Sequence, residues 1–170
     1  MNSEQPTLKT ILLVEDDPRD EELTLTALEA YNLANKVVVV RDGEQALDYL
    51  YRRGEFASRV GGDPIVVLLD LKMPKIDGLE VLKVLKADAG LKHIPVVVLT
   101  SSRQTPDLAA CYQHGVNAYV VKPVDFNDFI KAVKQLGLFW AAVNEPPPEP
   151  GRTESSHHPG ESPSLGRPAG

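Results

Sequence analysis

The 170-residue sequence is poor in cysteine, in aromatic side chains and in positive charge. Its lone cysteine, Cys111, cannot form an intrachain disulfide, which excludes a disulfide scaffold and fits a reducing compartment. Lys and Arg number 18 against 24 Asp and Glu, so the formal net charge of −6 leaves no electrostatic footprint for nucleic acid. No apolar run approaches the length of a membrane span, and the N-terminus lacks a basic and apolar signal pattern. We therefore expect a soluble cytoplasmic protein without a nucleic-acid or membrane partner.

Five short apolar runs alternate with five helix-like stretches, and this alternation predicts an α/β fold around a parallel sheet. The runs are continuous and rich in Val, Ile and Leu, as strands covered on both faces require. They lie near residues 10–14, 37–41, 65–70, 95–100 and 118–121.

The predicted helices carry start and stop signals. Asp17-Pro18 resembles an N-cap followed by proline at the first helical position, and Leu23, Ala27, Leu28 and Tyr31 supply an apolar stripe. The other helices are expected after Asp42-Gly43, from Asp77-Gly78 to near Gly90, from Thr105-Pro106 to near Gly115, and from near Asp125 to about Asn144.

Residues 145–170 differ from the rest of the chain. They are rich in Pro, Gly and Ser and hold almost nothing apolar beyond Leu165. Such a segment cannot bury enough surface to offset its chain entropy. We expect one domain over residues 1–144 and a disordered tail over residues 145–170.

Polar groups follow four of the apolar runs at the point where each predicted strand ends. These positions are occupied by Glu15-Asp16-Asp17, Asp70, Thr100 and Lys122-Pro123. A charge at the end of a buried strand is costly unless a partner or a metal compensates it. If the strands are parallel, the acids, the hydroxyl and the lysine meet at one edge of the sheet. That combination suits a divalent cation and a phosphoryl group, with the Asp70 carboxylate as a nucleophile toward phosphorus.

This order of groups resembles the receiver domain of bacterial two-component response regulators, the CheY-like family, over roughly residues 7–143. The resemblance implies a flavodoxin-like (βα)5 doubly wound parallel sheet with strand order 2-1-3-4-5. Within this family, the chain resembles the single-domain regulators that are paired with phytochrome-type histidine kinases. This narrower resemblance rests on Tyr49-Leu50, Arg53-Gly54-Glu55-Phe56 and Leu138-Phe139-Trp140.

The resemblance also implies roles for the residues at the strand ends. Asp70 is the expected phosphoacceptor, and Thr100 and Lys122 are expected to bind the phosphoryl group. Mg²⁺ is expected on the carboxylates of Asp16 and Asp70 and on the backbone carbonyl of Lys72, with Glu15 acting mostly through water. Asp17 is either the cap of the first helix or a metal ligand, and the helix cap is favoured.

Further roles concern signalling and phosphate lifetime. The resemblance makes Tyr119 an aromatic switch that moves inward when phosphate draws Thr100 inward, whereas the alternative is an ordinary half-buried strand tyrosine. It also implies a cis peptide bond before Pro123. Lys72 and Ser102 occupy positions that tune phosphate lifetime in the family.

The last predicted helix suggests how a signal leaves the domain. Its apolar residues follow a helical spacing that continues beyond the part needed to pack on the sheet, and an apolar patch at the end of an element often marks an interface. We expect a homodimer through helix 4, strand 5 and helix 5. The residues expected at the interface are Phe129, Val133, Leu136 and Trp140.

Three functions compete for this sequence. The first is a phosphorylatable response regulator that accepts phosphate from a histidine kinase, with no enzyme activity beyond self-catalysed phosphoryl acceptance and autodephosphorylation. The second is a receiver-like binding module that works without phosphorylation. The third is a phosphatase or phosphomutase, which is disfavoured because Lys72 stands where such enzymes carry a second Asp. Dinucleotide and FMN binding are disfavoured by the lack of G-x-G-x-x-G after the first strand and by the acids at Glu15-Asp16-Asp17.

Overall fold

The structure is a computed structural model, and it describes residues 10–30, 36–101, 105–122 and 127. Within these ranges, strands and helices alternate along the chain as expected. The elements are β1 (Ile11–Val14), α1 (Pro18–Ala30), β2 (Val37–Val40), α2 (Gly43–Tyr51), the 3-10 helix η1 (Gly54–Phe56), β3 (Val66–Leu69), α3 (Gly78–Ala87), β4 (Val96–Thr100), α4 (Thr105–Gln113) and β5 (Ala118–Val121).

The five strands form one parallel sheet with the order β2-β1-β3-β4-β5, which confirms the predicted flavodoxin-like α/β fold. β1 lies between β2 and β3, with Val14 opposite Val40 on one side and Leu69 on the other. This order makes the end of β1 a direct neighbour of the end of β3. Acids that are far apart in the sequence are therefore brought to one edge of the sheet.

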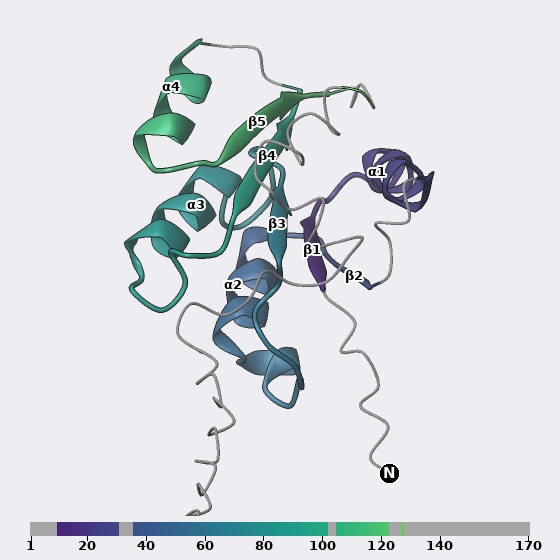
Figure 1. Cartoon of the computed structure of the whole chain (residues 1–170), viewed down its shortest axis with the longest axis vertical. Helices are drawn as coiled ribbons and strands as arrows, with labels where there is room; N and C mark the ends of the chain where they lie inside the picture. The colour runs from purple at the N-terminus through teal and green to yellow at the C-terminus, as the bar shows by residue number, and fades with distance from the viewer. Residues whose placement is uncertain (1–9, 31–35, 102–104, 123–126, 128–170) are drawn as a thin grey trace, which may run out of the picture.

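Helices cover both faces of the sheet, with α2, α3 and α4 on one face and α1 on the other (Figure 1). Alternate residues of β1 enter different cores: Leu12 and Val14 pack with residues of α2 and α3, whereas Ile11 and Leu13 pack with Leu28 of α1. Strands buried on both faces need continuous apolar runs, which is what the sequence provides.

Three of the predicted helix start signals, at Asp17, Asp42 and Asp77, are confirmed by hydrogen bonds. The carboxylate of Asp17 accepts from the backbone N–H of Arg19 at 2.8 Å, Asp42 accepts from Gln45, and Asp77 accepts from Glu80. The C-terminal end of α4 is followed by Gly115, which has φ +85°. The N–H groups of Gly115 and of the next residue donate back to the last turn of α4, as in a Schellman motif.

Two details of the predicted helices are wrong. The apolar stripe of α1 is misplaced at Leu23, which is 58% exposed, because Thr24 occupies the buried position one turn before Leu28. α3 ends at Ala87 rather than near Gly90. Asp88 has extended backbone angles, and its carboxylate accepts the N–H of Gly90, so a turn replaces the last helical residues.

The segment that resembles phytochrome-associated regulators forms the end of α2 and η1. The rings of Tyr49 and Phe56 meet edge to face with centroids 5.2 Å apart. The Arg59 guanidinium lies over the other side of this aromatic pair, 4.2 Å from the Tyr49 ring centroid. The loop after α2 is thus packed onto the helix by aromatic contacts.

Several predictions fall on residues outside the described ranges. These are the helix expected over residues 125–144, of which only Asn127 is described, the tail over residues 145–170, and the N-terminal part of the domain before residue 10. Among the helices that are described, none combines the length and the apolar character needed to cross a bilayer.

Candidate functional site at the carboxyl edge of the sheet

The backbone hydrogen bonds of the sheet fix the residues that follow the strands. The N–H of Glu15 donates to Val40 at 3.0 Å, and the N–H of Asp70 donates to Val14 at 3.0 Å. At the other side of the sheet, the N–H of Lys122 donates to Thr100 at 2.8 Å. Each residue is therefore held one position beyond a rigid strand, where side chains from neighbouring strands converge.

Three carboxylates come together at this edge. One oxygen from each of Glu15, Asp16 and Asp70 can be chosen so that all three lie within 4.8 Å of one another. Glu15 is 1% exposed and Asp70 is 7% exposed, whereas Asp16 faces solvent. The predicted acidic cluster is thus assembled, with two buried members and one exposed member.

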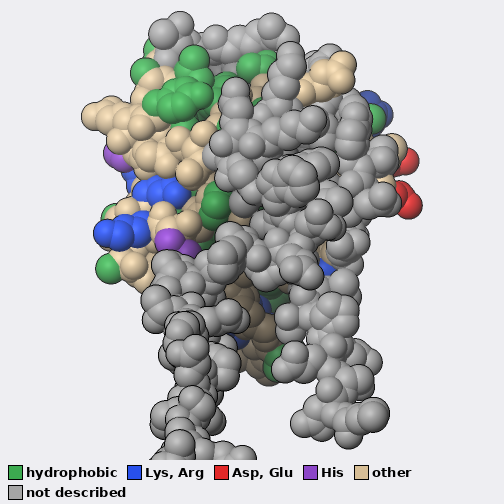
Figure 2. All heavy atoms as spheres, viewed as in Figure 1, with side chains coloured by type: hydrophobic (Ala, Val, Ile, Leu, Met, Phe, Trp, Pro, Cys, Tyr) green, Lys and Arg blue, Asp and Glu red, His purple; other side chains and the backbone are tan. Residues whose placement is uncertain are grey.

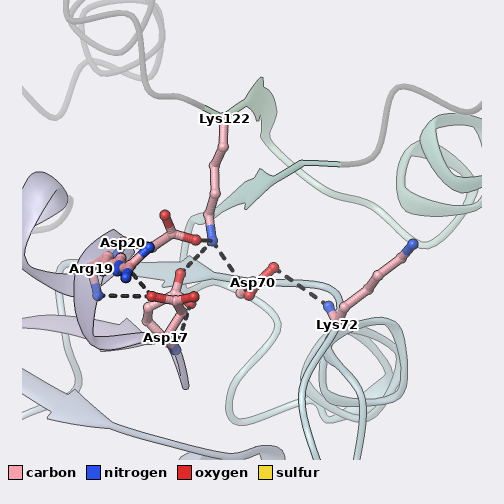
Figure 3. Close-up of polar contacts among 7 residues, drawn as sticks. Asp17, Arg19, Asp20, Asp70, Lys72 and Lys122 are labelled. Carbon is pink, nitrogen blue, oxygen red and sulfur yellow. Dashed lines mark hydrogen bonds and ion pairs between the residues drawn. The ribbon is translucent and has the colours of Figure 1, made fainter.

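Lys122 reaches into the same cluster from the end of β5, as Figure 3 shows. Its ammonium lies 2.5 Å from Glu15 Oε2, 2.9 Å from Asp20 Oδ2 and 3.4 Å from Asp70 Oδ2. The lysine side chain is only 7% exposed. A buried cation surrounded by three carboxylates is the arrangement that a charged group removed from water requires.

The charges in this cluster shift one another's titration. Burial raises the pKa of Glu15 to about 7, although its hydrogen bond with Lys122 opposes the rise. Burial also raises the pKa of Asp70, and the charge of Lys122 again acts in the opposite direction. Burial acts to lower the pKa of Lys122, but its carboxylate partners outweigh burial and raise that pKa above its ordinary range. Burial thus disfavours the charged forms of both acids, and the ammonium of Lys122 favours them.

This donor set fits a divalent cation. The acids offer only oxygen ligands, and hard cations such as Mg²⁺ prefer carboxylate oxygens while retaining some bound water. The exposed position of Asp16 leaves a path for a hydrated ion. A bound cation would favour the charged forms of Glu15 and Asp70, whose pKa values burial raises. The residues present thus match the metal that the sequence predicts.

Thr100 and Tyr119 lie on β4 and β5, the last two strands of the sheet. Thr100 ends β4 and is fully buried, with Val121 as its register partner. Tyr119 is half-buried on β5 and packs against the core that α2 and α3 cover. Tyr119 is the register partner of Val98, two positions before Thr100 on the neighbouring strand. The predicted coupling and the switch stay predictions.

The loop after β3 packs closely beneath Asp70. A Cβ atom on Gly78 would lie 2.0 Å from the carbonyl oxygen of Asp70, so only glycine allows the helix to start there. The N–H of Gly78 donates to the carbonyl of Leu71 at 2.8 Å and closes the loop. The close approach of Gly78, at the start of α3, thus fixes the backbone position of Asp70.

Lys72 contributes its backbone rather than its charge to the site. Its N–H donates to Asp70 Oδ1 at 3.4 Å, while its side chain points away from the carboxylate (Figure 3). The side chain instead lines a cleft of about 440 Å³ beside α3 and α4, together with Met73 and Cys111. The second carboxylate that a phosphatase would need is not at this position.

Asp17 and Asp20 belong to the first turn of α1. Asp17 Oδ1 accepts from the N–H groups of Arg19 and Asp20, and these bonds lower its pKa, so the favoured reading of Asp17 as a helix cap is confirmed. Asp20 binds Lys122, which the sequence analysis did not predict. The available signal was its place three residues after the cap, which brings it to the same end of α1 as the acids.

Several predicted site residues cannot be placed. Pro123 and the predicted interface residues Phe129, Val133, Leu136 and Trp140 lie outside the described ranges, as does Ser102. The predicted cis bond and the predicted dimer contacts of these residues therefore stay predictions.

Comparison with known proteins identifies relatives of this arrangement. The sequence model of the response regulator receiver domain matches residues 11–134. Response regulator Rcp1 from Synechocystis sp. (strain ATCC 27184 / PCC 6803 / Kazusa) is 39% identical over 140 residues, which are 82% of this chain and 94% of Rcp1. A solved structure of Rcp1, described as its Mn(2+)-bound form, superposes with a TM-score of 0.67 at 38% identity and covers 82% of this chain and 99% of that one.

Two structures of bacteriophytochrome response regulators are more similar in sequence. The regulator AtBRR is 64% identical with a TM-score of 0.74, and the match covers 82% of this chain and all of that one. The regulator RtBRR is 60% identical with a TM-score of 0.73, and the match covers 83% of this chain and 85% of that one. The predicted resemblance to phytochrome-associated regulators is confirmed by these matches.

Proposed function

Since the chain belongs to the response regulator receiver domain family, we propose that it accepts a phosphoryl group on Asp70 from a sensor histidine kinase and transmits the signal by binding another protein. The observation that carries the proposal is the placement of Asp70. Its carboxylate lies within the group formed with Glu15 and Asp16 and lies 3.4 Å from the ammonium of Lys122. A nucleophilic oxygen is thus placed between a candidate cation site and a fixed positive charge.

The proposed transfer exchanges one bond to phosphorus for another. An oxygen of Asp70 forms the new O–P bond while the P–N bond of a phosphohistidine breaks, and the bonding pair leaves with the imidazole nitrogen. Lys122 stabilises the charge that spreads over the phosphoryl oxygens, and the buried Thr100 hydroxyl donates a hydrogen bond to one of them. Attack of water on phosphorus later releases phosphate, so the activity is self-catalysed acceptance and hydrolysis.

Mg²⁺ is the proposed cofactor. The carboxylates of Asp16 and Asp70 and the backbone carbonyl of Lys72 are its proposed ligands, with Glu15 acting mostly through water. When bound, the ion supplies positive charge to the phosphoryl oxygens opposite Lys122. The Mn(2+)-bound form of Rcp1, a relative that covers most of this chain, supports a divalent cation.

The proposed donor is a phytochrome-type histidine kinase, and the proposed location is the cytoplasm. The bacteriophytochrome response regulators at 60% and 64% identity support the choice of kinase. The test is phosphotransfer from an autophosphorylated bacteriophytochrome kinase, with a histidine kinase of another sensor class as the control. Transfer at equal rates from both kinases would contradict the phytochrome assignment.

The proposed output is a homodimer through α4, β5 and the helix that follows. On the described part of this face, Leu108 and Tyr112 are 37% and 56% exposed and lie one turn apart on α4. Hydrophobic side chains gather over α4 in Figure 2. The dimer is tested by sedimentation of the wild type and of Tyr112→Ser at tens of micromolar protein, each with and without beryllofluoride. A wild type that stays monomeric in both conditions would contradict the proposal.

The proposal is tested directly by phosphorylation with acetyl phosphate. Intact mass or a phosphate-affinity gel should show one added phosphoryl group that requires both Mg²⁺ and Asp70. Asp70→Asn should abolish the modification, whereas Asp77→Asn, which changes a helix-capping aspartate on the following loop and keeps the cap, should be modified as the wild type is. An unmodified wild type that still binds Mg²⁺ would favour the phosphorylation-independent binding module.

A further inference from the structure

The contact between Asp20 and Lys122 has no place in the function proposed above. Asp20 Oδ2 lies 2.9 Å from the Lys122 ammonium and links the first turn of α1 to the end of β5, 102 residues later in the sequence (Figure 3). Asp20 is not a member of the three-carboxylate group that fits a cation. Its contact with the lysine therefore needs a separate explanation.

The position of Asp20 is fixed by the helix that carries it. The carboxylate of Asp17 accepts the backbone N–H of Asp20 at 3.3 Å, which orders the first turn of α1. The Asp20 side chain is 36% exposed, whereas the Lys122 side chain is 7% exposed. Asp20 thus approaches the buried ammonium from the solvent side of the site.

The distances around the ammonium are unequal. Lys122 is closer to Glu15, at 2.5 Å, and to Asp20, at 2.9 Å, than to Asp70, at 3.4 Å. An ammonium has three donor hydrogens, and three carboxylates already surround this one. The lysine is therefore held toward α1, and a phosphoryl oxygen on Asp70 must replace one of the carboxylates.

Of the three carboxylates around the Lys122 ammonium, that of Asp20 is the one that a phosphoryl oxygen can replace at the lowest cost. Glu15 is buried and belongs to the candidate cation group, whereas Asp20 is partly exposed and can be solvated by water when the lysine leaves it. The Asp20 carboxylate also places a negative charge beside the lysine where a phosphoryl dianion must bind. Competition for the lysine and charge repulsion therefore act in the same direction.

We propose that Asp20 is a positioning residue that holds Lys122 partly withdrawn from Asp70 and so weakens the binding of a phosphoryl group at that carboxylate. This inference rests on the proposed function, because it assumes that Asp70 accepts the phosphoryl group. Asp20 makes no bond to the phosphoryl group or to the donor, and it acts through its ion pair with the lysine and through the negative charge that it places beside the lysine.

The test measures phosphorylation by acetyl phosphate at saturating Mg²⁺ and separates KM from the maximal rate. Asp20→Asn removes the charge but keeps the size, so it should lower the KM for acetyl phosphate by about three- to fivefold, the upper part of the range expected when a partly exposed ion pair is removed. Asp20→Glu keeps the charge and should restore a KM within about twofold of the wild type.

Asp17→Asn is the matched control. It removes an aspartate charge from the same helical turn, and asparagine caps helices as well as aspartate does. Among the described residues, the Lys122 ammonium forms ion pairs with Glu15, Asp20 and Asp70 and none with Asp17. The KM of Asp17→Asn should therefore stay within about twofold of the wild type. Equal shifts for Asp17→Asn and Asp20→Asn would show a general charge effect and overturn the proposal. An unchanged or raised KM for Asp20→Asn would overturn it too.

Beryllofluoride binding provides a second measurement that needs no phosphoryl transfer. Asp20→Asn should bind beryllofluoride about three- to fivefold more tightly than the wild type in the presence of Mg²⁺. A wild type that binds beryllofluoride but accepts no phosphoryl group would contradict the proposed function and leave the role of Asp20 to be decided by these affinities. Equal affinities of the two proteins would overturn the role of Asp20. Urea unfolding of each variant separates these effects from a loss of stability, which would not lower KM.

Discussion

Replacing Gly78 by alanine should damage both the fold and the site, because this glycine lies directly beneath Asp70. An added Cβ would lie 2.0 Å from the Asp70 carbonyl oxygen and 2.7 Å from the Leu71 Cα, whereas real Cβ atoms essentially never approach closer than 3.0 Å. Both neighbours are backbone atoms, so no flexible side chain can move aside. The loop after β3 must shift by about 1 Å.

The size of the effect follows from this overlap. Overpacking of this kind costs about 1–3 kcal/mol, and the smaller unfolded-state entropy of alanine returns up to about 1 kcal/mol. We expect a net loss of about 1–2 kcal/mol in the free energy of unfolding. For a chain of this size each kcal/mol lowers Tm by about 2–4 °C. A shift of about 1 Å in a reacting group can slow a reaction up to about 10²-fold, so the phosphorylation rate should fall by more than the stability alone requires.

The assay compares Gly78→Ala with Gly62→Ala. A Cβ on Gly62 meets no atom within 4 Å and its φ is not in the left-handed region, so this variant should stay within about 0.5 kcal/mol of the wild type. Urea unfolding gives the stability, and phosphorylation by acetyl phosphate under conditions where both variants are folded gives the rate. If Gly78→Ala matched Gly62→Ala in both measurements, the close packing of α3 against Asp70 would be refuted.

Two further predictions concern buried charge. Burial raises the pKa of Glu15 to about 7 in the folded protein, from an ordinary value of 4.5, so the folded state binds more protons than the unfolded state between these pH values. The stability of the metal-free protein should therefore fall as pH rises from about 4.5 to 7. Glu15→Gln should flatten this pH dependence in urea unfolding, and an unchanged slope would contradict the prediction. Lys86→Met should lower stability by about 1–3 kcal/mol, because the Lys86 ammonium donates to Asn117 Oδ1 and to two backbone carbonyls within residues 92–94. Lys83→Met, which removes the exposed ion pair with Glu80, should lower the stability by less than about 1 kcal/mol. Equal losses of stability for the two lysine variants would show that the hydrogen bonds of Lys86 add nothing to the stability.

The strands and the polar groups at their ends could be predicted because simple patterns encode them, whereas the strand order followed from the resemblance to the receiver domain family. A run such as Ile65–Leu69 must be a strand buried on both faces, and a carboxylate at its end requires compensation. Once such strands are parallel and ordered 2-1-3-4-5, Glu15, Asp70 and Lys122 must converge. The structure brings these residues together as expected.

What could not be predicted depends on tertiary contacts. Leu23 and Thr24 are neighbours in α1, and the face of α1 that packs on the sheet carries Thr24 and Leu28, so the threonine is buried instead of the leucine. Asp20 reads in the sequence only as a favourable charge at a helix N-terminus. Its contact with Lys122 exists because α1 and the end of β5 meet across a long sequence separation.

The measurement that most directly tests the central claim is identification of the phosphorylated side chain. The protein is treated with acetyl phosphate and Mg²⁺, reduced with borohydride and digested, and the peptide that contains residue 70 is sequenced by mass spectrometry. An acyl phosphate is reduced to an alcohol, so our account predicts homoserine at position 70 only in the phosphorylated sample. Homoserine at another aspartate, or a stable phosphate ester on a hydroxyl residue with Asp70 unchanged, would contradict the account.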